Sequence, residues 1–98
     1  MKRNMTISDF YCTECGRKGL PVQRKMGRER EPGHLKNLYC LYCGKNVNMV
    51  EIRPFGTKYT LKDFEDEFRY GNFKDGKRIL SLGDFKQMRN TIEVHNNG

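Results

Sequence analysis

Cys12-Thr13-Glu14-Cys15-Gly16 and Cys40-Leu41-Tyr42-Cys43-Gly44 are the two stretches that decide the fold, and they contain every cysteine of the 98-residue chain. Paired Cys-x-x-Cys units at about this separation are the usual ligand pattern of a structural zinc ion, which binds four thiolates tetrahedrally. The glycine after each second cysteine supports this interpretation. The backbone must turn its amide hydrogens toward the thiolates, and glycine adopts the positive-φ conformations of such turns without a Cβ clash. The sequence therefore predicts one Zn²⁺ with four ligands: Cys12, Cys15, Cys40 and Cys43.

A disulfide framework is the alternative use of four cysteines in a short chain. The chain opens with the polar residues 1–6 and not with an apolar signal segment, which favours a reducing, cytoplasmic location. Reduced thiols favour metal binding. No stretch approaches the roughly 18 apolar residues of a membrane-spanning helix, so we expect no membrane partner.

The cysteine and glycine positions within residues 8–54 resemble those of zinc ribbons, which implies β-hairpins around a four-cysteine metal site. Rubredoxins carry two similar knuckles, and Phe10 and Tyr11 before the first knuckle resemble theirs; that alternative implies iron and electron transfer. However, this chain is basic, has no tryptophan, and carries Leu41 and Tyr42 inside the second knuckle, where rubredoxins have a proline. These differences favour zinc over iron, although four thiolates alone suit both metals.

The sequence predicts an α+β fold in two parts, a zinc ribbon over residues 8–54 and a helical extension over residues 55–95. We expect the extension to pack on the ribbon or on a partner. A chain of this size with 36% hydrophobic residues buries only a modest core. The metal is therefore expected to supply much of the folding free energy.

Local patterns predict the elements after the second knuckle. Alternating apolar and polar residues predict a strand over residues 47–52. Thr60 and Asp63 are placed as a helix N-cap and its capping-box partner, and Gly71 ends that helix. A second short helix is expected to begin near Ser81, and residues 91–94 to add a closing strand.

The side chains of these two helices give further expectations. The apolar stripe of the first helix, Leu61, Phe64 and Phe68, is expected to meet the apolar face of the second. An aromatic patch left uncovered there would mark a partner or homodimer interface. The acidic run at residues 63–67 is expected on the solvent face, in the early turns where the helix dipole favours negative charge.

Positive charge is concentrated in the half of the chain that contains the cysteines. Residues 1–50 carry a formal charge of +6 and residues 51–98 carry +1, which together give the net +7. Four thiolates on one Zn²⁺ add about −2, so a surplus of positive charge remains. The surplus indicates an anionic partner.

Much of this charge lies in the spacer between the knuckles. Leu20-Pro21-Val22 and Leu38-Tyr39 have the character of short strands, so we expect the spacer to form a ribbon hairpin with a basic tip near residues 26–34. The residues expected to contact nucleic acid or a partner are Arg17, Lys18, Arg24, Lys25, Arg28, Arg30, Lys36 and Tyr42. Those of the hairpin would bind phosphates, and Tyr42 would stack on a base.

We therefore predict a non-catalytic zinc-ribbon protein that binds DNA or RNA. The alternative is a protein-binding adaptor or inhibitor of a nucleic-acid-processing complex, of the kind encoded by bacteria and their phages; rubredoxin-like electron transfer is a remote third. Neither His34 nor His95 has a catalytic setting. No catalytic or phosphate-cradling motif occurs in the sequence, so we do not expect an enzyme.

Overall fold

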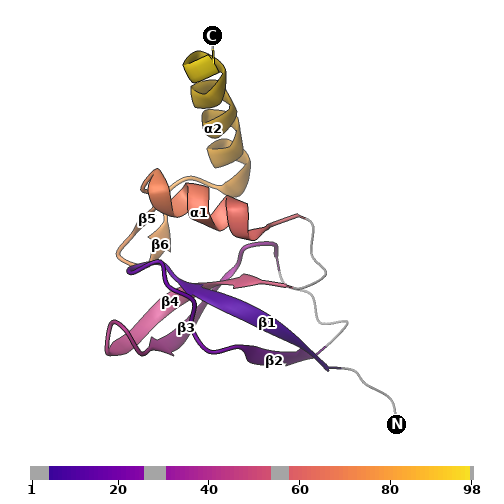
Figure 1. Cartoon of the computed structure of the whole chain (residues 1–98), viewed down its shortest axis with the longest axis vertical. Coiled ribbons are helices and arrows are strands. Elements are labelled where there is room, and N and C mark those ends of the chain that lie inside the picture. Colours follow the sequence, from indigo (N-terminus) through magenta and orange to yellow (C-terminus); the bar gives the residue numbers. More distant parts are fainter. Residues whose placement is uncertain (1–4, 26–30, 54–57, 98) are drawn as a thin grey trace.

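The computed structural model describes residues 5–25, 31–53 and 58–97, and Figure 1 shows a sheet with helices above it. The N-terminal half contributes the strands β1 (Met5–Cys12), β2 (Val22–Lys25), β3 (Leu35–Cys40) and β4 (Lys45–Ile52). The C-terminal half contributes α1 (Leu61–Arg69), the short strands β5 (Phe73–Lys74) and β6 (Lys77–Arg78), and α2 (Leu82–Asn97). The chain is thus an α+β protein.

The spacer between the knuckles does not form the predicted hairpin. The sheet is antiparallel with the order β2-β1-β4-β3, so the two ends of the spacer lie at opposite edges of the sheet. Instead, β2 pairs with β1 across the first knuckle, and β3 pairs with β4 across the second. Of the predicted basic tip, residues 26–30 lie outside the described residues.

The two faces of the sheet bury different clusters. Phe10 and Cys12 of β1 meet Val47 and Met49 of β4 on one face, beside the cysteines. Val50 contributes to a second cluster on the opposite face, as the alternation of side chains along a strand requires. The face that contains Val50 and packs against α1 is called the outer face below.

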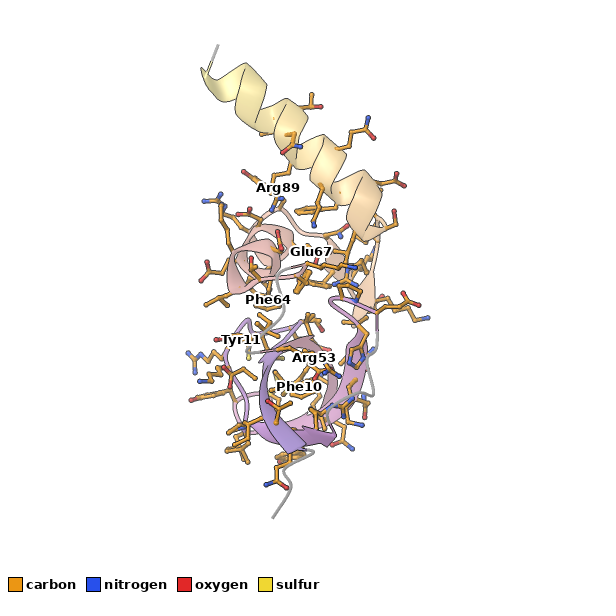
Figure 2. All side chains as sticks on the ribbon, turned by 90° about the vertical axis from the view of Figure 1, so that its right-hand side faces the viewer. Phe10, Tyr11, Arg53, Phe64, Glu67 and Arg89 are labelled. Carbon is orange, nitrogen blue, oxygen red and sulfur yellow. The ribbon has the colours of Figure 1, made fainter. Side chains whose placement is uncertain are left out.

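Helix α1 begins and ends as its sequence predicts. Thr60 and Asp63 form a reciprocal capping box, and Gly71 follows the helix with a φ of 76°. Phe64 of α1 is buried, and its ring lies 5.3 Å from the ring of Tyr11 on β1 (Figure 2). The C-terminal half therefore packs on the sheet through an aromatic contact.

Helix α2 differs from its prediction at its C-terminal end. It starts after Ser81, whose hydroxyl accepts a hydrogen bond from the Asp84 amide, as expected. The closing strand predicted over residues 91–94 is wrong, because the helix continues to Asn97. No glycine or proline interrupts residues 84–97, and the helix extends away from the sheet, where no strand is available for pairing (Figure 1).

The packing between the two helices also departs from the simple face-to-face contact that their apolar stripes predict. Leu82 packs against the cluster around Phe64, whereas Phe85 lies with its ring 6.2 Å from Tyr70, just after α1. Ionic contacts complete the junction, since the Arg89 guanidinium lies 3.0 Å from Asp63 and 2.9 Å from Asp66. These contacts fix the start of α2 on α1.

The expectation that the acidic run faces solvent is wrong for Asp66 and Glu67, which are buried. Glu67 has no exposed surface and accepts hydrogen bonds from Arg78, at 2.6 and 2.9 Å, and from Tyr59 and Asn72, both at 2.6 Å. A buried carboxylate is tolerated when it is paired and its oxygens are satisfied. Glu67 therefore joins α1 to β6 and to the segments on either side of the helix.

Removing the cation of this buried pair should strongly destabilise the protein. We expect Arg78→Met to lower the free energy of unfolding by about 3–5 kcal/mol, because Glu67 is then left as a buried charge without a counterion. Urea denaturation followed by circular dichroism measures the change. Lys77→Met is the matched control, since Lys77 is the exposed neighbour on β6. Equal stability of the two variants would show that the pair does not hold the C-terminal half together.

Candidate metal centre

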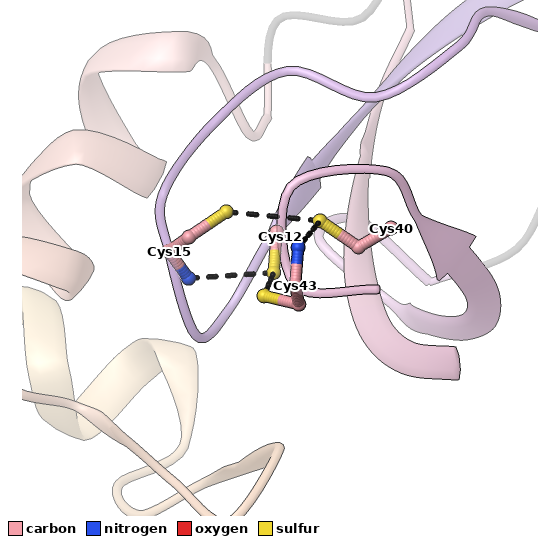
Figure 3. A group of neighbouring side chains, drawn as sticks. All are labelled: Cys12, Cys15, Cys40 and Cys43. Atoms are coloured by element: carbon pink, nitrogen blue, oxygen red, sulfur yellow. Dashed lines mark hydrogen bonds between the residues drawn. The ribbon is translucent and has the colours of Figure 1, made fainter. Parts of the chain in front are cut away.

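The four cysteines converge where the sheet meets its two knuckles, the first at residues 12–16 and the second at residues 40–44. Cys12 ends β1 and Cys40 ends β3, and these strands flank β4 on either side. Cys15 and Cys43 follow in the turns, so each knuckle contributes one sulfur from a strand end and one from a turn (Figure 3).

The sulfur positions confirm the predicted four-cysteine cluster. All four Sγ atoms lie within 4.8 Å of one another, and the Cys12–Cys43 and Cys15–Cys40 pairs are 3.7 Å apart. A tetrahedral zinc ion with Zn–S bonds of about 2.3 Å requires sulfurs about 3.8 Å apart. A disulfide requires about 2.05 Å, and all four cysteines are free. The spacing is therefore that of a metal site.

The backbone of both knuckles is arranged as the glycines predict. Gly16 and Gly44 have φ angles of 76° and 72°. The amides of Glu14 and Cys15 lie 3.3 and 3.4 Å from the Cys12 sulfur, and the Cys43 amide lies 3.4 Å from the Cys40 sulfur. These N–H groups offset part of the negative charge that four thiolates bring together.

The thiols differ in how readily they ionise. Burial acts to raise the pKa of Cys40, but hydrogen bonds from the Cys43 and Tyr42 amides outweigh it and lower the pKa to about 7. Burial raises the pKa of Cys12, and it raises the pKa of Cys43 to about 12. Without a cation, the thiols of Cys12 and Cys43 would therefore keep their protons at neutral pH. Binding of a divalent metal would release these protons.

The donor set fits a structural metal ion. Four sulfurs fill a tetrahedral coordination shell and leave no position for a reactive water. Zinc matches this donor set well, and the same four thiolates would also hold iron.

The predicted binding residues near the knuckles lie in different settings. The Arg17 guanidinium lies 4.6 Å from the centre of the Tyr42 ring, and Tyr42 is 60% exposed. Lys18 pairs with Asp9 at 3.5 Å on the surface. Lys36 lies half-buried on β3. The fold therefore places Arg17, which directly follows the first knuckle, beside Tyr42 of the second knuckle.

The remaining predicted residues belong to the spacer. Arg24 turns inward, is only 15% exposed, and lies 3.3 Å from Glu51, so its charge is already matched within the protein. The Lys25 side chain, Arg28 and Arg30 lie outside the described residues, so their predicted role in binding is untested.

Glu51 is a buried residue that the sequence analysis did not single out. Its carboxylate lies among Arg24, His34 and Arg53 (Figure 2 labels Arg53). Burial alone would raise the pKa of Glu51, but the hydrogen bond with His34 and the charge of Arg24 hold it below its ordinary value. The cluster accounts for His34 as a structural residue.

Other exposed residues near the knuckles were also missed as candidates. Tyr39 and Leu41 are 58% and 66% exposed, and Lys45 pairs with Glu14 at 3.3 Å on the surface. The alternation along β3 could have placed Tyr39 on the face opposite Cys40. For Lys74 and Lys77, on the hairpin of β5 and β6, the sequence offered only their charge as an indication of a binding role.

No known protein family, curated protein or solved structure matches the chain. Within the part of the chain that the structure describes, neither helix combines the length and the apolar composition that a bilayer span needs. The interpretation of the site therefore depends on the geometry of this chain.

Purified protein should contain one metal ion per chain. We expect elemental analysis to find one equivalent of zinc and colourless protein, whereas visible absorbance and a red colour would indicate iron. Cys12→Ser and Cys40→Ser should each lose most of the metal, because oxygen replaces a thiolate ligand. Native mass spectrometry measures the stoichiometry. Full metal retention by both variants would contradict a four-sulfur site.

The two knuckle glycines should differ in their tolerance of a side chain. A Cβ at Gly16 would lie 2.9 Å from the Phe68 ring of α1, whereas a Cβ at Gly44 would meet nothing within 4 Å. Both positions have positive φ, which costs about 1–2 kcal/mol for a residue with a Cβ. We expect Gly44→Ala to lose about that amount of stability and Gly16→Ala to lose more, as measured by thermal unfolding of metal-loaded protein. A smaller loss for Gly16→Ala would contradict the contact between the first knuckle and α1.

Proposed function

We propose that the chain is a zinc-ribbon protein that binds nucleic acid without catalysing a reaction. In this proposal residues 8–54 form the ribbon, residues 55–95 form an extension that packs on it, and Zn²⁺ is a structural ion. The observation that carries the proposal is the pair of Arg17 and Tyr42, which joins the two knuckles at an exposed surface.

A structural role for the metal is supported by the closed donor set. A catalytic zinc keeps one coordination position for water or substrate, and here four sulfurs occupy all positions. His34, the one histidine whose side chain the structure describes, is paired with Glu51 and not directed at the sulfurs. These contacts support a scaffold and not a reaction centre.

The charge of the chain supports an anionic partner. Among the described residues, Arg17 has no acidic partner within ion-pair distance, and its guanidinium instead lies over an exposed ring. Lys18 and Lys45 each pair with an exposed carboxylate, and such surface pairs contribute little and exchange readily for a phosphate. Arg24 is left out of the proposed interface because Glu51 already neutralises it.

A second candidate function is a protein-binding adaptor or inhibitor of a nucleic-acid-processing complex. Leu20 and Leu41 support it, since both are large, apolar and well exposed near the knuckles. The expected homodimer contact through aromatic residues of the C-terminal half has less support, because Phe64 and Phe85 are buried within the chain itself. One stoichiometric protein that stays bound after nuclease treatment would favour this second function.

Nucleic-acid binding should depend steeply on salt. The logarithm of the affinity should fall linearly with the logarithm of the salt concentration, by about 0.9 per phosphate contacted on a duplex and about 0.7 on a single strand. The triple variant Arg17→Gln, Lys18→Gln, Lys36→Gln should bind more weakly and show a shallower slope. Fluorescence anisotropy with labelled oligonucleotides measures both quantities.

The matched control is Lys58→Gln, Lys62→Gln, Lys86→Gln, which removes the same charge near the helices. It should change the affinity much less. A flat salt slope, or an equal loss for the two triple variants with zinc retained, would count against an interface at the knuckles.

A further inference from the structure

The outer face of the sheet is covered at one end and open at the other. Antiparallel register places three cross-strand pairs along this face: Leu35 with Val50, Asn37 with Asn48, and Tyr39 with Asn46. The first pair packs in the cluster around Phe64 of α1. The last pair lies at the second knuckle, where Tyr39 and Asn46 are exposed. An aromatic ring and an amide therefore form the uncovered end of the face.

The hairpin of β5 and β6 contacts the middle pair of this face, next to the open end. The Asn48 side chain donates a 2.7 Å hydrogen bond to the Gly76 carbonyl, and Asn37 donates one of 3.2 Å to Asn48. Asp75 and Gly76 both have positive φ, as a tight two-residue hairpin turn requires. The hairpin turn is therefore held against the middle pair of the outer face.

The strands of this hairpin place two lysines directly opposite each other. Lys74 pairs in register with Lys77, both are exposed, and neither makes an ion pair with a described residue. Like charges directly opposite on a strand pair destabilise it. Two ammonium groups without an ion pair to a described residue therefore lie on the hairpin whose turn contacts the outer face, and such a pair favours an anionic partner.

Arg17 and Tyr42 form a second exposed pair of a cation and an aromatic ring at the knuckles. Tyr42 follows Tyr39 by three residues, and the guanidinium over its ring adds a cation to an exposed aromatic surface. Exposed aromatic rings beside cations stack on unpaired bases, whereas the bases of a duplex are already stacked and present only their edges.

We propose that the nucleic acid bound by this protein is single-stranded. Its bases stack on Tyr39 and Tyr42, and its phosphates contact Arg17 at one end and Lys74 with Lys77 at the other. This proposal rests on the nucleic-acid binding proposed above and adds the strand state and the second group of phosphate contacts. Asn46 lies beside Tyr39, where its amide can donate to and accept from a base edge.

The test uses full-length, zinc-loaded protein with labelled oligo(dT), oligo(rU) and a mixed-sequence duplex, each of about ten nucleotides or base pairs. We expect single strands to bind at least about tenfold more tightly than the duplex. Tyr39→Ala and Tyr42→Ala should each weaken single-strand binding by about 5- to 150-fold, the range for loss of one stacked base. Tyr39→Phe and Tyr42→Phe should bind as the unaltered protein does, and Ile79→Ala is the control for an exposed apolar side chain. The DNA and RNA arms distinguish the two sugars.

The lysine pair has a matched test. Lys74→Gln, Lys77→Gln should make the salt slope for single strands shallower by about 1.4, or about 0.7 for each phosphate that is no longer neutralised. Lys58→Gln, Lys86→Gln removes the same charge and should leave the slope unchanged. Zinc content is measured for every variant.

A separate experiment tests the site without any substitution. Oligonucleotides with halogenated uracil are photo-cross-linked to the unaltered protein, and peptide mapping should place the cross-links at residues 39–42.

The possible outcomes distinguish the single-strand inference from the nucleic-acid binding on which it rests. Equal binding of duplex and single strand, unaffected by the tyrosine and lysine substitutions but weakened by the Arg17, Lys18, Lys36 variant, would overturn the single-strand inference and leave nucleic-acid binding in place. No binding to any oligonucleotide, with one protein partner recovered after nuclease treatment, would overturn both. Cross-links that map elsewhere would overturn the assigned site.

Discussion

Four sulfur atoms held within 4.8 Å of one another are the constraint on which the rest of the sheet depends. As thiolates they repel one another, and as neutral thiols they gain little from such closeness, so a divalent cation is what makes the arrangement favourable. β1 and β3 flank β4 and end at Cys12 and Cys40, so a cation between the knuckles also fixes both strand ends. The apolar core of the sheet is small, which increases the share of stability that a bound metal would supply.

Buried ion pairs are the second source of order in this small basic protein. Glu51 of β4 lies among the side chains of Arg24, His34 and Arg53. Glu67 of α1 is enclosed by Arg78 and by the neutral donors Tyr59 and Asn72. These cations include Arg24 from the edge strand β2 and Arg78 from the hairpin strand β6. The basic residues therefore divide into a group that is neutralised inside the molecule and a group at the surface that remains available to a partner.

Features fixed by local sequence were predicted well. The knuckles, their glycines and the capping box of Thr60 depend on residues within a few positions of one another, and the structure has all of them. The pairing of β2 with β1 could not be predicted from composition, because strand pairing depends on contacts across the sheet. The burial of Glu67 depends on Arg78, eleven residues further along, and nothing in the pattern of α1 alone reveals that partner.

The site shows the same difference between features set by neighbouring residues and features set by contacts across the fold. Cysteine spacing identified all four members of the sulfur cluster, but the inward turn of Arg24 follows from its position on an edge strand near a buried carboxylate. Tyr39 is distinguished from an ordinary core aromatic only by the register that places it on the open end of a face.

The contact between Gly16 and Phe68 links the two halves of the molecule thermodynamically. The backbone of the first knuckle packs against Phe68 of α1, so the conformation of residues 12–16 that would bind a metal ion is also the one that packs against the helix. Occupancy of the sulfur site and docking of the C-terminal half therefore stabilise each other by the same free energy. Binding of a metal ion at the knuckles would therefore also stabilise the packing of α1 on the first knuckle.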